Sequence, residues 1–230
     1  MCPNFCENEL TISGPDVERV LAAMRDLESD DPDEHIFDFD KIIPYPQELK
    51  DLDQRSAEYQ AKFFAIAKDD PDRDKKLKDL GDEYGVEPGS PCLKDGYNSG
   101  GYEWSIDNWG TKWNAIRVSL TKRPANAPLA EIATCAHCQI QHRTAGLTVL
   151  VCQKCGAPLP DTRPIVALVE FETAWSPPSP VVEKLAAMFP DHDFELEYYE
   201  GGVGFCGQAR WTGGQEQYHN TSEYAGLRGG

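Results

Sequence analysis

The chain has 230 residues, 40% of them hydrophobic, so it can bury a sizeable core as one large domain or one domain with insertions. Its formal net charge of −17 argues against general binding to nucleic acid, whose phosphates are met by cationic side chains, and favours partners with a basic surface. No run of about 18 apolar residues indicates a membrane span, and the first residues, MCPNFCENEL, lack the basic-then-apolar order of an export signal. We therefore expect a cytoplasmic protein with no membrane segment.

Two strand–helix pairs are predicted near the two ends of the chain. Residues 7–14, ENELTISG, alternate apolar and polar side chains as a half-buried strand does, and Gly14-Pro15 ends the pattern. The next segment, PDVERVLAAMRDL at residues 15–27, places apolar side chains at helical spacing on one face. Residues 179–190, SPVVEKLAAMFP, share part of this wording and predict a second helix. Further strands are predicted at residues 113–121, 165–173 and 194–200.

In chain order these elements are strand, helix, strand, strand, helix, strand. This is the order of the ferredoxin-like split βαβ arrangement, an α+β fold in which both helices cover one face of a sheet. Residues 1–121 and 164–210 are expected to form this body, with a helical insertion at about residues 47–100 that Asp70-Pro71 divides into two helices. Residues 211–230 are expected to be a polar C-terminal tail.

Four cysteines form two tight pairs within residues 122–163, which proline-rich stretches separate from the strands on either side. The spacing is C-x2-C, thirteen residues, then C-x2-C, and the four are Cys135, Cys138, Cys152 and Cys155. Two thiolates from each tight turn can complete a tetrahedron around a zinc ion, so the segment resembles a zinc ribbon. Residues 139–151 are expected to form a hairpin that turns at Ala145-Gly146 and brings the pairs together.

The predicted Zn²⁺ is structural, because four sulfur ligands leave no coordination position for water or substrate. Iron held by the same thiolates and a redox-active C-x-x-C pair are the alternatives. His137 and His142 could replace a cysteine but are not needed. Few cations lie nearby, so nucleic-acid binding through this segment is expected at most locally; they are Lys122, Arg123, Arg143, Lys154 and Arg163.

Aromatic and amide side chains gather between residues 101 and 115, in GYEWSIDNWGTKWNA, and Trp175 adds a further tryptophan. Such a cluster suits either a rigid corner of the core or a recognition surface, because tryptophan buries a large area while its N–H needs a partner. The core corner is favoured. As a recognition surface, the set would comprise Trp104, Asn108, Trp109, Lys112, Trp113, Asn114 and Trp175.

Five segments carry a family resemblance: PNFCENELTISG (3–14), FDFDKIIPYPQEL (37–49), NWGTKWNA (108–115), FETAWSPP (171–178) and YYEGG…FCG (198–207). They resemble the YubB-like family of phage- and plasmid-borne proteins of unknown function, whose named domain is ferredoxin-like. The chain departs from the family pattern at Phe5, at an added Cys2 and by its cysteine segment, so the metal module is expected to be an accessory. The resemblance implies a mobile-element protein that works inside a bacterial host.

The leading hypothesis is a non-enzymatic accessory protein that binds a host or element protein, as a defence inhibitor or host-takeover factor. An acidic surface can present carboxylates in place of phosphates to a basic nucleic-acid channel. One alternative is an enzyme acting on nucleotides or nucleic acid, although no nucleophile–base pair is legible; its candidate groups are His192, Glu200, Cys206 and the Asn108, Lys112 and Asn114 set. Another is local nucleic-acid binding by the cysteine segment. The final Leu-Arg-Gly-Gly matches the ending of ubiquitin-like modifiers.

Overall fold

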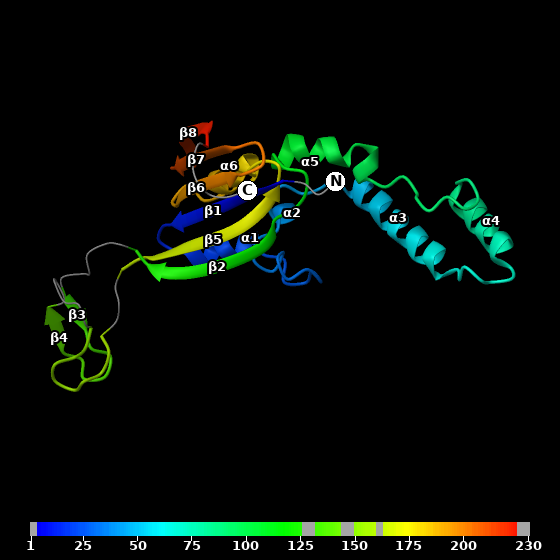
Figure 1. Ribbon diagram of the computed structural model, residues 1–230. Coiled ribbons are helices and arrows are strands. Elements are labelled where there is room, and N and C mark those ends of the chain that lie inside the picture. The colour runs from blue at the N-terminus through cyan, green and yellow to red at the C-terminus, as the bar shows by residue number, and fades with distance from the viewer. Residues whose placement is uncertain (1–3, 126–131, 144–149, 160–162, 225–230) are drawn as a thin grey trace.

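The computed structural model describes residues 4–125, 132–143, 150–159 and 163–224 (Figure 1). One antiparallel sheet has the strand order β2-β5-β1-β6-β7-β8. Its strands are β1 (Phe5–Ser13), β2 (Ile116–Pro124), β5 (Ile165–Ala174), β6 (Asp193–Glu200), β7 (Phe205–Thr212) and β8 (Gln215–Glu223). A second, two-stranded sheet pairs β3 (Ile132–Thr134) with β4 (Gln141–Arg143) inside the cysteine segment.

Four strands of the large sheet and two helices have the predicted ferredoxin-like topology. They follow the chain order β1, α1 (Val17–Met24), β2, β5, α6 (Ser179–Met188), β6. Strand β5 lies between β2 and β1, and β6 pairs with the other side of β1, always antiparallel. Each helix therefore connects two parallel strands that a third strand separates, which is the split βαβ arrangement. The predicted fold class is confirmed.

The prediction of a polar tail from residue 211 onward is wrong for residues 211–224. Strand β7 continues to Thr212 with Trp211 fully buried, and β8 pairs along its length with β7. Gly213 and Gly214, with φ of 64° and 74°, form the two-residue turn between these strands. The side chains of β8 are almost all polar and exposed, so the segment lacks the apolar alternation that marks a strand. The final Leu-Arg-Gly-Gly lies outside the described residues.

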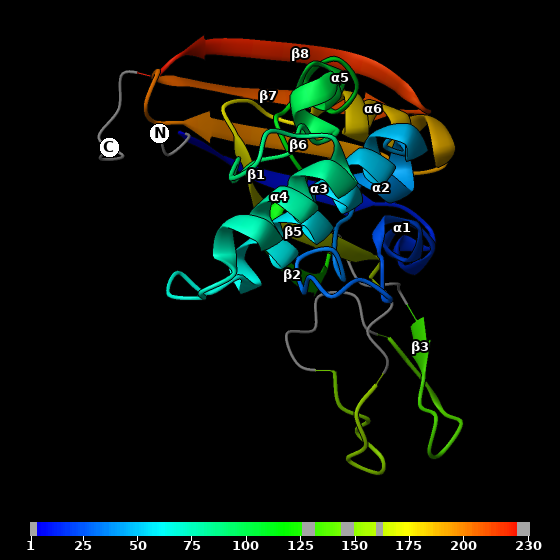
Figure 2. The same ribbon diagram turned by 90° about the vertical axis from the view of Figure 1, so that its right-hand side faces the viewer.

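The core lies between the sheet and one layer of helices. Along β1, Leu10 and Ile12 are fully buried while Glu7 and Glu9 are exposed, so successive side chains point to opposite faces. Helices α1 and α6 lie on the same side of the sheet (Figure 2), and their apolar faces are fully buried at positions such as Leu21 and Leu185. In the described part of the chain, the opposite face of the sheet carries no helix.

The insertion before β2 adds helices α2 (Phe39–Ile42), α3 (Gln47–Ala65), α4 (Arg73–Tyr84) and α5 (Gly101–Trp109), with a short 3₁₀ turn at Tyr97–Ser99. Helices α3 and α4 form a hairpin that projects away from the sheet (Figure 1). Four buried side chains give this hairpin a small core of its own: Tyr59, Phe63, Leu80 and Tyr84. None of the described helices combines the length and the apolar content needed to cross a bilayer.

Helix α5 was not predicted, because Gly100 and Gly101 stand at its start and its sequence is crowded with aromatic residues, which are weak helix formers. The helix buries Gly101, Ser105 and Trp109, which are spaced four residues apart on one face. A side chain at Gly101 would meet the hydroxyl oxygen of Tyr45 at 2.0 Å. Glycine thus allows the helix to approach Tyr45 closely enough to complete the core.

Candidate metal centre and open face of the sheet

The four cysteines predicted as metal ligands lie together. Their Sγ atoms are all within 4.8 Å of one another, with 3.6 Å between Cys135 and Cys155 and 3.5 Å between Cys138 and Cys152. A tetrahedral zinc ion with Zn–S bonds of about 2.3 Å holds its sulfur atoms roughly 3.8 Å apart. The cluster therefore has the size and the donor set to bind one tetrahedral metal ion through four thiolates.

Each C-x-x-C pair forms the same tight turn. The N–H of Gln139 donates to the carbonyl oxygen of Cys135 at 2.9 Å, and the N–H of Gly156 donates to that of Cys152 at 2.8 Å. Gln139 and Gly156 both have left-handed backbone, with φ of 57° and 75°, a conformation that glycine adopts most easily. Each pair is thus a separate knuckle, and the two knuckles present two sulfur atoms each.

The predicted hairpin over residues 139–151 differs from the structure. Its turn at Ala145-Gly146 lies outside the described residues. Strand β4 pairs back with β3 across the first knuckle, and Val151 bridges to Pro158 across the second. Each cysteine pair therefore sits at the tip of its own small hairpin, because the tight C-x-x-C turn itself brings the flanking residues together.

Backbone N–H groups favour the thiolate form at two of the cysteines. The N–H of Cys138 is the largest influence on Cys135 and lowers the pKa of its thiol. At Cys152 burial raises the pKa, but hydrogen bonds from the N–H groups of Cys155 and Lys154 and from the thiols of Cys155 and Cys138 together outweigh burial, and the pKa falls to about 6. His142 Nε2 lies 3.1 Å from Cys152 Sγ, within hydrogen-bonding distance of one sulfur of the four-cysteine cluster. His137 is exposed.

The tryptophan-rich segment forms α5 and the turn after it. Trp109 is 7% exposed, and its ring centroid lies 5.9, 5.8 and 5.4 Å from those of Phe39, Tyr45 and Trp104. Its Nε1 donates to the carbonyl oxygen of Ile43 at 2.8 Å. A tryptophan packed on several sides with its N–H satisfied is typical of a core corner. The geometry favours that interpretation for Trp109 and Trp104.

The other predicted members of this set are spread over separate positions. Lys112 Nζ lies 4.7 Å from the ring centroid of Trp113, and Asn108 donates within α5 to the carbonyl oxygen of Trp104. Trp175 is 38% exposed with a left-handed φ of 74°, and in the described ranges no ring contact joins it to another tryptophan. A binding role for Trp113 and Trp175 stays a prediction.

Asn114 fastens the acidic loop before α2 to the start of β2. Its Oδ1 accepts from the N–H of Phe39 at 2.9 Å, and its Nδ2 donates to Glu34 at 3.0 Å and Asp38 at 2.7 Å. Asp38 is only 2% exposed, and burial raises the pKa of its carboxyl, an effect that the hydrogen bond from Asn114 opposes. These hydrogen bonds indicate that Asn114 has a structural role, because they hold the loop in place.

We expect Asn114→Ala to destabilise the protein by about 2–3 kcal/mol, because it leaves a buried carboxylate without its side-chain donor. The pKa of Asp38, already raised by folding, should rise further, so ionising Asp38 costs more in the folded state. The loss should therefore be larger at neutral pH than at about pH 4, where the carboxyl takes up its proton. Urea unfolding at both pH values measures it. Asn108→Ala is the matched control, and equal losses for the two variants would contradict the role of Asn114.

Two of the groups proposed for an enzyme, His192 and Glu200, lie far apart. His192 is fully buried at the start of β6, where its ring bonds to the carbonyl oxygen of Asp16 at 3.0 Å and to Asp191 at 3.0 Å. Glu200 is fully buried at the other end of β6 and accepts from the N–H groups of the following turn. Eight residue steps separate these two, which corresponds to about 26 Å along a strand. They cannot act on one substrate atom.

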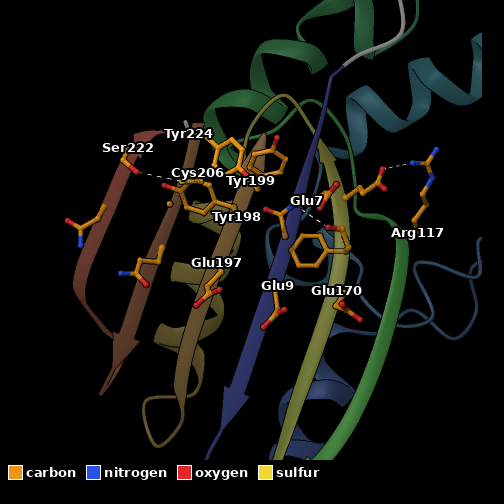
Figure 3. A pocket seen from close by; sticks show the side chains of 16 residues that line it. Glu7, Glu9, Arg117, Glu170, Glu197, Tyr198, Tyr199, Cys206, Ser222 and Tyr224 are labelled. Carbon is orange, nitrogen blue, oxygen red and sulfur yellow. Dashed lines mark hydrogen bonds and ion pairs between the residues drawn. The ribbon is translucent and has the colours of Figure 1, made fainter. Parts of the chain in front are cut away.

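The open face of the sheet carries a row of glutamates that was not predicted. Glu9 of β1 pairs in register with Glu170 of β5 on one side and with Glu197 of β6 on the other. All three side chains are exposed and point away from the helices, and they lie side by side across three neighbouring strands (Figure 3). Adjacent strands are about 4.8 Å apart. We call Glu170, Glu9 and Glu197 the glutamate row.

A second row, one step along the strands, contains Glu172, Glu7 and Tyr199. Arg117 Nη1 lies 2.6 Å from Glu172 and neutralises it. Within the described residues, by contrast, no Lys or Arg forms an ion pair with any member of the glutamate row. The two rows line a shallow hollow of about 830 Å³ that extends across β7 to β8. This hollow is an open acidic surface with one cation at its margin.

One family model agrees with the ferredoxin-like assignment. A family model described as "Ferredoxin-like domain in Api92-like protein" matches residues 166–224, the part of the chain from β5 to β8. The crystal structure of protein Api92 from Yersinia pseudotuberculosis is similar at 10% sequence identity, with a TM-score of 0.39 over 98% of this chain and 99% of that chain. No curated protein matches the chain.

Proposed function

We propose that this chain is a non-enzymatic accessory protein of a phage or plasmid that binds a host protein with a basic surface, and that the open face of the sheet makes the contact. The five segments that resemble the YubB-like family support the origin and, with it, a place in the bacterial cytoplasm. The net charge of −17 supports a partner whose surface is positively charged. We place the contact with the partner on the open face of the sheet, because in the described residues no helix covers that face.

The observation that carries this proposal is the glutamate row. Like charges directly opposite each other on neighbouring strands destabilise a sheet, by roughly 0.2–1 kcal/mol for each pair. The row contains two such pairs, Glu9 with Glu170 and Glu9 with Glu197. A cationic partner would be attracted by the same carboxylates that repel one another in the free protein. Complementary charges across an interface speed association and select partners. The arrangement is unfavourable for the free protein and favourable for a complex.

We expect replacement of the glutamate row by glutamine (Glu9→Gln, Glu170→Gln and Glu197→Gln) to weaken binding of the partner about tenfold or more. The matched control is Glu58→Gln, Glu87→Gln and Glu183→Gln, three exposed glutamates outside the sheet that change the net charge equally. The partner is first captured from bacterial lysate at low and moderate salt and is then purified for titration. The row variant should also be slightly more stable than the control, because its two repulsive pairs are gone. Equal binding by both variants would refute the proposal.

As a defence inhibitor or host-takeover factor, the protein would compete with nucleic acid for its partner. Carboxylates spaced along strands offer the same charge as phosphates to a basic channel. We therefore expect the purified partner to lose affinity for nucleic acid when this protein is added, and to keep that affinity when the row variant is added. If the partner binds this protein and nucleic acid at the same time, competition is excluded. The proposed binding of the partner to this protein would still hold.

We assign the metal of the four-cysteine cluster as zinc with a structural role. Four thiolates at tetrahedral spacing match the ligand preference of zinc. All four positions of a tetrahedral ion are then filled by sulfur, so the ion would hold the two knuckles together and supply no site for substrate. Metal analysis of the purified protein should find one zinc per chain; one iron per chain, with its visible absorption, would contradict this assignment.

A further inference from the structure

The two edges of the six-stranded sheet differ in how they are protected. At the β2 edge, Asp33 accepts from the N–H groups of Arg117 at 2.6 Å and Val118 at 2.9 Å, so an acidic loop covers the start of the strand. A bulge between Ile116 and Ser119 interrupts the register, and the strand ends in Lys122, Arg123 and Pro124. Loops, bulges, lysines and prolines at an edge prevent other strands from adding to it.

The β8 edge lacks most of these features. Its sequence, QEQYHNTSE, contains no lysine, arginine or proline, and its one irregularity is at Gln217. From Tyr218 to Glu223 the strand is in unbroken register with β7, from Arg210 to Phe205. In the described part of the chain, no strand pairs with the outer side of β8 (Figure 2). About 20 Å of regular backbone is therefore open to pairing.

We propose that the β8 edge between Tyr218 and Glu223 binds an extended segment of another protein as an added antiparallel strand, with Lys or Arg at alternate positions on the face of the sheet that carries Glu223. Backbone groups of β8 would supply the hydrogen bonds, as in other cases of strand addition. This surface is separate from the glutamate row, so the inference goes beyond the proposed function and does not depend on it.

Charge decides between a foreign strand and a second copy of this chain. Each copy carries a net charge of −17, so pairing of two copies brings together two strongly acidic molecules. Strand β8 itself has Glu216 and Glu223 and no Lys or Arg, so a cationic segment gains a favourable cross-strand neighbour that a second β8 lacks. The occupant is therefore a cationic extended segment.

The test uses the unaltered protein and a synthetic seven-residue peptide of alternating threonine and lysine. Two N-methylated forms of the peptide are compared. In the first, the backbone amides of all lysines are methylated, and in the second, the backbone amides of all threonines are methylated. In a strand, alternate amides point to opposite edges, so only one of the two forms loses its hydrogen bonds to β8. We expect the two forms to differ in affinity about tenfold or more. The unmethylated peptide should slow hydrogen exchange of amides between Tyr218 and Glu223.

Three results would overturn the inference. The first is equal binding of the two methylated forms, which have the same charge and composition and would then be held by the acidic face alone. The second is no binding of the unmethylated peptide. The third is a dimer in sedimentation that the peptide does not dissociate, which would mean that a second copy occupies the edge. Repeating the titration with the glutamate-row variant separates the two proposals, because the ratio between the methylated forms depends on β8 only.

Discussion

Removal of the metal by a chelator is expected to unfold the four-cysteine module while the six-stranded body stays folded. The module has a small hydrophobic core, with Cys135, Cys152 and Leu159 as its buried members in the described ranges. Structural zinc in small domains supplies about 10–16 kcal/mol of apparent binding free energy, which is also their folding free energy. The ferredoxin-like body has its own core, to which no described residue of the module belongs. Amide NMR spectra before and after chelation would show collapsed shifts for residues 132–143 and 150–159 only.

The matched variants for this prediction are Cys135→Ser and Cys206→Ser. Cys135 is a buried member of the metal cluster, whereas Cys206 lies on β7 with its Sγ 3.6 Å from the hydroxyl of Ser222. The first variant should lose its zinc and the ordered module, and the second should keep both. If the metal-free protein keeps the dispersed spectrum of the module, the ion is not what holds the knuckles together.

Trp109→Ala is expected to destabilise the body by about 3–5 kcal/mol, the usual cost of removing a buried large aromatic side chain. Trp109 joins helix α5 to the distant segment at residues 39–45, since it packs on Phe39 and Tyr45 and bonds to the carbonyl oxygen of Ile43. The substitution therefore leaves a cavity and an unpaired carbonyl group at one corner of the core. Urea unfolding monitored by far-ultraviolet circular dichroism measures the loss.

Trp113→Ala is the control for this second prediction. Its ring is half-buried and contacts Lys112 at 4.7 Å from the centroid. An exposed cation–π contact contributes about 0.5–1 kcal/mol, so this variant should stay close to the parent in stability. Equal losses for the two variants would contradict the core-corner interpretation. A Trp109→Ala variant that keeps full stability and loses partner binding would instead place this tryptophan in a recognition surface.

The ferredoxin-like body was predictable because its signals are local. Alternation in residues 7–14 and helical spacing in residues 15–27 come from the contact of each element with one shared core. Strand β8 was missed because it has no buried face of its own and forms by pairing with β7. The signal that could have found it is Gly213-Gly214, a two-residue turn favoured in hairpins, directly after a strand that buries Trp211.

The candidate sites also differ in whether the sequence alone could predict them. The metal ligands were predictable from spacing, since each C-x-x-C turn brings its own two sulfur atoms together. The glutamate row depends on register between strands that are far apart in sequence, which spacing does not encode. A signal was nevertheless present in the predicted strands: Glu170 and Glu197 each lie between two apolar residues, and Glu9 directly precedes Leu10. The ferredoxin-like order makes these three strands neighbours, so their exposed glutamates had to share one face.

The most direct test of the central claim, that recognition belongs to the open sheet face and the metal serves only its own module, is one set of titrations with the purified partner. The partner is titrated against the metal-loaded protein, the chelated protein and the glutamate-row variant. We predict nearly equal affinity for the first two and a loss of about tenfold or more for the third. Binding that disappears on chelation and survives in the row variant would contradict the claim and move recognition to the four-cysteine module.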